Sequence, residues 1–205
     1  IKDFILLYLS IIVLIMFISK NNYYLYIENT QTLNLSLLKK RNKFIIIYRT
    51  SGKIENIQRL KSFKRECSRR AIKFYVANNL VTAIKCKADG LYISSHNKKY
   101  YHGEFLNKTL KIIGSAHNLR EIQQKKVQRC KNIVFSRLFK TNYQNKLDYM
   151  GIVKFNLRKL SFNTELIPLG GIRHKNLNSL KLVKSDSFAL LSEVKKKPAI
   201  IRRLF

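Results

Sequence analysis

The chain contains few glycines, prolines, cysteines and acidic residues. Its 205 residues include 7 glycines, 2 prolines, 3 cysteines and no tryptophan. So few glycines and prolines exclude a collagen-like chain, and three cysteines are too few for a disulfide scaffold. Cys67, Cys86 and Cys130 lie far apart and form no C-x-x-C pair, which argues against a zinc module and is typical of a reducing compartment. With 46% hydrophobic residues the chain is not disordered, and its length fits one domain.

Acidic residues are the scarcest charged group: 11 stand against 41 Lys and Arg, which gives a formal net charge of +30. Such a charge suits nucleic acid, an anionic membrane or anionic substrates. The basic residues are spread along the whole chain, and the abundance of Ile, Lys, Asn, Tyr and Phe indicates a compositional bias. The chain has no RNA- or DNA-binding signature. We therefore expect anionic substrates and no specific nucleic-acid partner, with a polyanion-binding protein as the alternative.

Residues 1–20 form an apolar N-terminal extension. Its uncharged run, Phe4–Ile18, is shorter than the about 20 apolar residues of a membrane-spanning helix, and a signal peptide would need a more basic start. The chain begins with Ile1, and Met16 precedes a segment typical of the start of a soluble domain. We interpret the extension as an over-extended reading frame, with a membrane anchor as the alternative. Membrane contact is expected only for an anchor, and the expected location is cytoplasmic.

Short β-rich runs alternate with longer segments from Tyr23 onwards. The runs are apolar throughout, as in parallel strands that are covered on both faces. Strands are expected at Tyr23–Glu28, Phe44–Tyr48, Lys73–Val76, Gly90–Ile93, Lys111–Gly114, Asn132–Phe135, Leu166–Leu169 and Ser187–Leu190. Apolar spacing and a cap at Asn118 predict helices over Ile54–Arg70, Leu119–Lys126, Lys175–Lys184 and Lys197–Phe205. Eight such units predict an α/β fold, a single (β/α)₈ TIM barrel over residues 21–205.

Gly170 and Gly171 directly follow the seventh expected strand. In such a barrel the loops after strands seven and eight commonly bind a phosphate through backbone N–H groups, and glycine lets the backbone approach an anion closely. Ser192, after the eighth strand, could add a hydroxyl group. The pattern predicts a phosphate site, and a simple tight turn is the other interpretation. There is no G-x-G-x-x-G and no P-loop, so a dinucleotide fold has no support.

Four short segments share a recognisable pattern: Ala88–Ile93 (ADGLYI), Ile113–Leu119 (IGSAHNL), Ile167–Ile172 (IPLGGI) and Asp186–Ser192 (DSFALLS). In order and spacing they resemble the thiamine-phosphate synthase and thiazole tautomerase family, from about Tyr23 to Phe205. The resemblance implies a transferase of thiamine biosynthesis that joins a hydroxymethylpyrimidine pyrophosphate to a thiazole phosphate and releases pyrophosphate. It implies these two phosphorylated substrates as partners and Mg²⁺ as cofactor. A homo-oligomer is compatible with it.

The resemblance also places catalytic residues. Arg49 matches the family's arginine after strand two, whereas Ile47 and Ser51 replace its glutamine and lysine. Lys53 lies two residues further on and could reach the same anion. Ser115 matches the serine after strand five. These matches predict Arg49, Lys53 and Ser115 as the catalytic residues.

The remaining matches concern substrate binding. Thr141 matches the first threonine of the family's T-x-T-K loop, whose lysine is lost here. Lys140 or Lys146 could substitute for that lysine. Gly171 and Ser192 match the thiazole-phosphate site. The resemblance therefore predicts that the thiazole-phosphate half of the site retains the residues of the family.

The metal positions depart from the family. Its two Mg²⁺-binding aspartates correspond to Asn78 and Asn97, and neutral amide oxygens are weaker ligands than carboxylates for this hard cation. We expect weak Mg²⁺ binding, with Asn78 still contacting substrate. A catalytically degenerate member that only binds a phosphorylated ligand is the alternative, as is a tautomerase-like paralogue. The tautomerase histidine corresponds to Arg137. His96 and His102 are interpreted as surface residues, and His117 is expected to orient its loop.

Overall fold

The computed structural model describes residues 22–38, 41–101, 110–141, 148–173 and 176–190. The N-terminal extension, His102, Lys146, Ser192 and the helix expected at Lys197–Phe205 lie outside these ranges. No helix within them is long and apolar enough to cross a membrane.

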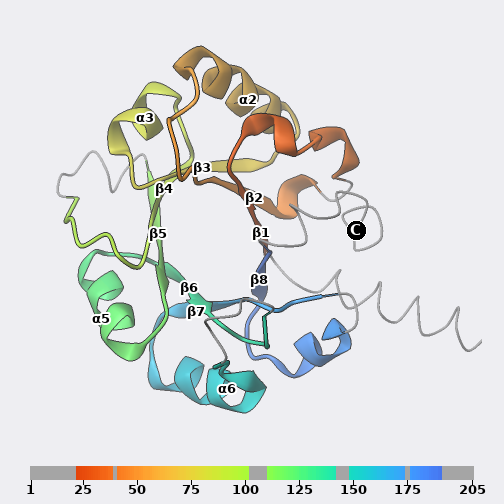
Figure 1. Ribbon diagram of the computed structural model, residues 1–205, viewed down its shortest axis with the longest axis vertical. Helices are drawn as coiled ribbons and strands as arrows, with labels where there is room; N and C mark the ends of the chain where they lie inside the picture. Colours follow the sequence, from red (N-terminus) through yellow and green to blue (C-terminus); the bar gives the residue numbers. More distant parts are fainter. Residues whose placement is uncertain (1–21, 39–40, 102–109, 142–147, 174–175, 191–205) are drawn as a thin grey trace, which may run out of the picture.

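Eight parallel strands close into a barrel in sequence order, with the helices on the outside (Figure 1). The strands are β1 (Asn22–Ile27), β2 (Phe44–Tyr48), β3 (Lys73–Ala77), β4 (Gly90–Ile93), β5 (Lys111–Ala116), β6 (Asn132–Ser136), β7 (Glu165–Leu169) and β8 (Ser187–Leu190). The barrel closes where β1 pairs with β8, with Tyr23 opposite Phe188. The expected (β/α)₈ fold is confirmed, and each expected strand is present with its ends shifted by at most two residues.

Asparagine caps begin three of the helices. The helices are α2 (Ile57–Arg69), α3 (Leu80–Lys85), α5 (Leu119–Val127) and α6 (Gly151–Ser161), with short 3₁₀ turns between some strands. The side chains of Asn56, Asn79 and Asn118 accept hydrogen bonds from backbone N–H groups in the first turns of α2, α3 and α5. Each cap satisfies a donor that the helix itself leaves unpaired. The predicted cap at Asn118 is confirmed, and the cap at Asn56 starts α2 later than expected.

The prediction of a helix over Lys175–Lys184 is wrong. The structure has a 3₁₀ turn, η5, at Asn178–Leu182. The three-residue spacing of Leu177 and Leu180, both buried, fits a 3₁₀ turn as well as an α-helix. Two helices, α3 and α6, were not expected, and in α6 the apolar side chains do not all face the barrel: Val153 is 73% exposed.

Alternate residues of the strands form two separate cores. One set lies between the sheet and the helices, and the other fills the barrel interior. The interior set includes Tyr24, Tyr26, Tyr75, Tyr92, Ile45, Ile47, Ile113, Val134, Ile167 and Ala189. Tyr26 of β1 donates a hydrogen bond to Tyr92 of β4, 3.1 Å between hydroxyl oxygens, a contact that can only cross the interior. Because both faces are buried, the strands show no polar alternation.

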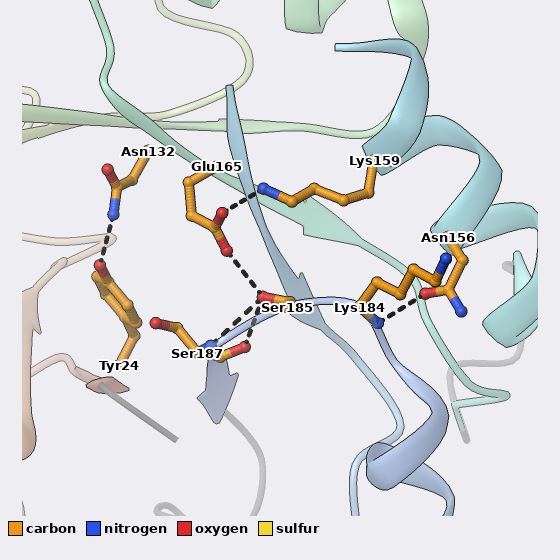
Figure 2. Close-up of polar contacts among 8 residues, drawn as sticks. All are labelled: Tyr24, Asn132, Asn156, Lys159, Glu165, Lys184, Ser185 and Ser187. Atoms are coloured by element: carbon orange, nitrogen blue, oxygen red, sulfur yellow. Dashed lines mark hydrogen bonds and ion pairs between the residues drawn. The ribbon is translucent and has the colours of Figure 1, made fainter. Parts of the chain in front are cut away.

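Polar contacts seal the amino end of the barrel, the end where the strands begin (Figure 2). Lys159 of α6 forms an ion pair with Glu165 at the start of β7. Glu165 also accepts a hydrogen bond from the hydroxyl of Ser185 at 3.2 Å. Inside the barrel the Asn132 amide donates to the Tyr24 hydroxyl at 3.1 Å. In this fold such contacts at the amino end serve stability, and the opposite end carries function.

The three cysteines should be inert in the native protein. Cys67, Cys86 and Cys130 are buried free thiols. Burial raises the pKa of Cys67 and of Cys130 to about 12 and also raises that of Cys86, and thiols react as thiolates. A disulfide-exchange reagent at pH 8 should therefore titrate almost no thiol in native protein and all three in denaturant. Rapid modification of the native protein would contradict this packing.

Candidate functional site

The carboxyl ends of the strands gather the predicted residues at one end of the barrel. Because all the strands are parallel, the loops that follow them lie on the same side. Arg49 follows β2, Asn78 follows β3, Asn97 lies in the loop after β4, Ser115 is near the end of β5, and Gly171 follows β7. These five residues are spread over more than a hundred positions of the sequence. They nevertheless border the same end of the barrel, the end formed by the loops after the strands, which we call the mouth.

Two tyrosines of the barrel interior form the floor of this mouth. The Tyr26 hydroxyl donates to that of Tyr92 at 3.1 Å, and Tyr92 also forms a side-chain hydrogen bond with Ser115. Burial raises the pKa of both phenols, and the positive charge of Arg49 acts on both in the opposite direction. Arg49 is exposed at the mouth, and its positive charge acts on Tyr26 and Tyr92.

Asn78 and Asn97, the expected metal positions, contact each other. The Asn97 amide nitrogen donates to Oδ1 of Asn78 at 3.1 Å, and the same oxygen accepts from the Ser94 backbone N–H at 2.9 Å. The Asn97 amide also donates to the Tyr101 hydroxyl at 3.0 Å, which donates to the Asn78 carbonyl oxygen at 3.2 Å. The side-chain oxygen of Asn78 is thus engaged with N–H donors, in an arrangement that two carboxylates could not adopt.

The donor set around this pair does not fit Mg²⁺. The ion prefers anionic oxygen ligands, and both candidate ligands are neutral carboxamides, one of them turned toward the other. Oδ1 of Asn97 accepts from the Lys99 backbone N–H at 2.9 Å. Within the described ranges no group of three or more His, Cys, Asp or Glu side chains could hold a metal ion.

The loop after β7 fits tightly against the loop after β6. Gly171 has φ +68°, a conformation that favours glycine, and a Cβ atom there would lie 2.5 Å from the carbonyl oxygen of Phe139 and 2.6 Å from that of Lys140. The Asn176 amide donates to the Gly171 carbonyl oxygen at 2.7 Å. Between described residues, no backbone hydrogen bond uses the N–H of Gly171. A backbone N–H that the protein itself does not use can bind an anion, as in known backbone phosphate sites.

Thr141 adds a hydroxyl group from the end of the β6 loop. Its Oγ1 is buried and has no hydrogen-bond partner among the described residues. A buried hydroxyl without a partner costs free energy unless a ligand or water satisfies it. Lys140, one residue earlier, is exposed. The two residues therefore offer a hydroxyl donor and an exposed positive charge near Gly171.

His117 and Ser136 were not predicted as a pair. Nδ1 of His117 lies 2.7 Å from the Ser136 hydroxyl, and the His117 backbone N–H donates to Glu121 at 2.6 Å. The first contact joins the ends of β5 and β6, and the second joins the loop after β5 to the first turn of α5. Both are in agreement with the expectation that His117 orients its loop. His96 is exposed, and its ring centroid lies 6.4 Å from that of His117.

One predicted residue, Lys53, is exposed in the loop after β2 and makes none of these contacts. Another, Ser192, lies outside the described residues. The interior tyrosines, by contrast, were missed as site residues. The only available signal was the recurrence of Tyr in the strand runs Tyr23–Glu28 and Gly90–Ile93, and that signal is indistinguishable from core packing.

A sequence model of the family "Thiamine monophosphate synthase" matches residues 16–194. The chain is 28% identical over 171 residues to a thiamine-phosphate synthase of Prochlorococcus marinus, covering 82% of this chain and 49% of that protein. It is 25% identical over 183 residues to thiamine-phosphate synthase 1 of Streptococcus pneumoniae, covering 84% and 82%. The solved structure of a thiamine phosphate pyrophosphorylase from Pyrococcus furiosus superposes with a TM-score of 0.69 at 14% identity, covering 91% and 94%.

The comparisons differ in what they show about the chain. The structural likeness, at such low identity, shows the fold alone. The chain also spans only about half the length of two Prochlorococcus marinus relatives, 49% and 42%. The family match, however, covers all eight strands and every described residue of the mouth. The chain belongs to the thiamine monophosphate synthase family.

Proposed function

We propose that the protein is a thiamine-phosphate synthase-type transferase, which joins a hydroxymethylpyrimidine pyrophosphate to a thiazole phosphate and releases pyrophosphate. The observation that supports it best is the family match over residues 16–194 combined with Arg49, Ser115 and Gly171 at one mouth of the barrel. The bond between the pyrimidine methylene carbon and the pyrophosphate oxygen breaks, and the thiazole nitrogen captures the resulting cation. A cytoplasmic location belongs to the same proposal.

Each half of the mouth has its own task in this reaction. The Gly171 N–H and the Thr141 hydroxyl bind the thiazole phosphate, with Ser192 from the next loop. Arg49, an exposed cation directly after β2, binds the pyrophosphate near the Tyr26 and Tyr92 hydroxyls. Holding two anionic substrates in line turns an encounter of two molecules into a reaction within one complex.

Positive side chains neutralise the departing pyrophosphate in this proposal. The pair Asn78–Asn97 does not supply the anionic ligands that Mg²⁺ prefers, so Arg49 and Lys53 provide the stabilising charge. A fixed guanidinium group can stabilise developing negative charge on a phosphate. We expect Mg²⁺, if it binds, to bind weakly and to arrive with the pyrophosphate.

The same pair of asparagines supports a second candidate function. Because the Asn97 amide donates to Asn78 and both side chains are neutral, the protein could bind a phosphorylated thiazole or pyrimidine without turnover. Such a protein would keep the phosphate site around Gly171 and lose the chemistry.

Product formation from the two precursors tests the proposal against this alternative. The wild-type protein should form thiamine phosphate and pyrophosphate in equal amounts. Arg49→Ala should lower the rate by about 10²-fold or more, as expected for loss of a charge that stabilises the transition state. Ligand binding with no product would leave the second candidate, and binding only to polyanions, with steep loss in salt, would exclude both.

A further inference from the structure

A lysine is fully buried beneath the loop that carries Asn97. Lys125 of α5 has 0% of its surface exposed, although lysine is almost never fully buried unless it is paired. Its ammonium group donates to the carbonyl oxygen of Asn97 at 2.8 Å and to the side-chain oxygen of Gln128 at 2.8 Å. The positive charge of Lys125 is therefore hydrogen-bonded to a main-chain carbonyl oxygen of the loop after β4.

Gln128, one turn along, binds the same loop. Its amide donates to the carbonyl oxygen of Asn97 at 3.0 Å and to that of Lys99 at 2.8 Å. Lys125 and Gln128 thus make three hydrogen bonds to two loop carbonyls and one to each other. A buried network in which the donors find acceptors holds its parts rigidly.

The barrel provides room for this lysine at a glycine. A Cβ atom at Gly114 of β5 would lie 2.9 Å from Cδ of Lys125 and 3.1 Å from its Cγ. The apolar part of the Lys125 side chain therefore packs against β5 at Gly114, where no side chain blocks it. Its ammonium group reaches the loop after β4. A helix position that would ordinarily face solvent through a charged side chain is directed inward here.

Asn97, the residue that Lys125 and Gln128 bind, is one of the residues that border the mouth. Asn97, whose carbonyl oxygen receives both donors, donates its own amide to Asn78 and Tyr101. Fixing the backbone at Asn97 thus fixes the carboxamide pair that replaces the metal ligands of the family. A cation in a metal site would order these two loops, and here hydrogen bonds from α5 do so.

We propose that Lys125 and Gln128 are positioning residues, which clamp the loop after β4 and so hold Asn78 and Asn97 for the pyrophosphate half of the substrate. The substrate part of this inference rests on the proposed function. The clamp itself does not, since it can be measured without turnover.

The test compares Lys125→Met, which keeps an apolar stem and removes the charge, with Lys131→Met, the same change at an exposed lysine. In Lys125→Met, hydrogen exchange of the backbone amides of residues 94–100 should accelerate at least about tenfold, as expected for loss of charged hydrogen bonds. Affinity for inorganic pyrophosphate, measured without metal, and KM for the pyrimidine pyrophosphate should worsen about tenfold. KM for the thiazole phosphate should not change, and Lys131→Met should match wild type.

Gln128→Leu provides the second variant. It removes two bonds to the loop and the bond from Lys125, and it leaves the bond from Lys125 to the Asn97 carbonyl oxygen in place. It should give the same pattern, and it decides the matter if Lys125→Met does not fold. Unchanged exchange in residues 94–100, or an equal rise of KM for both substrates, would overturn the clamp. A wild-type protein without turnover, whose loop is nevertheless loosened in both variants, would refute the proposed function and leave the clamp standing.

Discussion

Gly171→Ala should lower the affinity for thiazole phosphate about 10- to 100-fold, the loss expected when one charge-assisted hydrogen bond is broken. The new Cβ atom would lie 2.5 Å and 2.6 Å from the carbonyl oxygens of Phe139 and Lys140. These are backbone atoms, which cannot swing away as a flexible side chain would. The loop after β7 must therefore shift and take the Gly171 N–H out of line with the phosphate.

Gly151→Ala is the matched control. Gly151 also has a positive φ, +73°, but a Cβ atom there would meet nothing within 4 Å. Both variants carry a similar cost in backbone strain, and only Gly171→Ala disturbs the loop. Calorimetry should show wild type and Gly151→Ala binding thiazole phosphate far more tightly than the neutral thiazole alcohol. In Gly171→Ala that preference should disappear, while the weak affinity for the alcohol stays unchanged. If phosphate adds no affinity in wild type, the assignment of this site is wrong.

Asn78→Asp combined with Asn97→Asp should convert a site indifferent to Mg²⁺ into one that requires it. The two side chains are in contact, with 3.1 Å between the Asn97 nitrogen and the Asn78 oxygen. Two carboxylates at that separation repel each other unless they share a proton or a cation. The double variant should therefore be less stable than wild type without metal, and Mg²⁺ should restore it. At 100 times its Kd, Mg²⁺ would add about 2.7 kcal/mol, or about 5–10 °C in Tm for a chain of this size.

The single variants are the controls for this experiment. Asn78→Asp keeps an acceptor for the Asn97 amide and the Ser94 N–H, so it should fold normally and respond little to Mg²⁺. Thermal denaturation and product formation should be measured against Mg²⁺ concentration in all four proteins. Activity of the wild type should depend little on Mg²⁺, and that of the double variant strongly. Tight Mg²⁺ binding by unaltered protein, with activity only in its presence, would show that the ligands lie elsewhere.

The fold could be predicted because its signals are local. Apolar runs such as Phe44–Tyr48 and Asn132–Phe135 mark buried parallel strands wherever they occur, and their regular recurrence indicates the barrel. The failure at Lys175–Lys184 arose from the same source, since a three-residue spacing does not separate a 3₁₀ turn from an α-helix. The helix α6 escaped notice because exposed Val153 and buried Phe155 blur its apolar face.

The candidate site was predicted only in part. Arg49, Ser115 and Gly171 each follow or end a strand, so a sequence that defines the strands also places them at one mouth. What these residues contact could not be read in the same way. Tyr92 is one of several tyrosines in the strands, and nothing local says that its hydroxyl meets those of Tyr26 and Ser115 across the barrel.

The sequence by itself determined the order of the eight units, the asparagine cap of α5 and the family, and it placed Asn78 and Asn97 where the resemblance implies acidic residues. Tertiary structure alone decided that these two side chains bond to each other, that a Cβ atom at Gly171 would strike the next loop, and that Lys125 points inward. The physical reason is that strand and helix patterns depend on neighbours a few residues away. Contacts at and beneath the mouth join residues 19 to 31 positions apart, which meet only when the barrel closes. From the sequence alone, a lysine on a helix is expected to be a solvated charge. Only the structure shows that β5 offers Gly114 beside its stem and that the loop after β4 offers the carbonyl oxygen of Asn97 to its ammonium group.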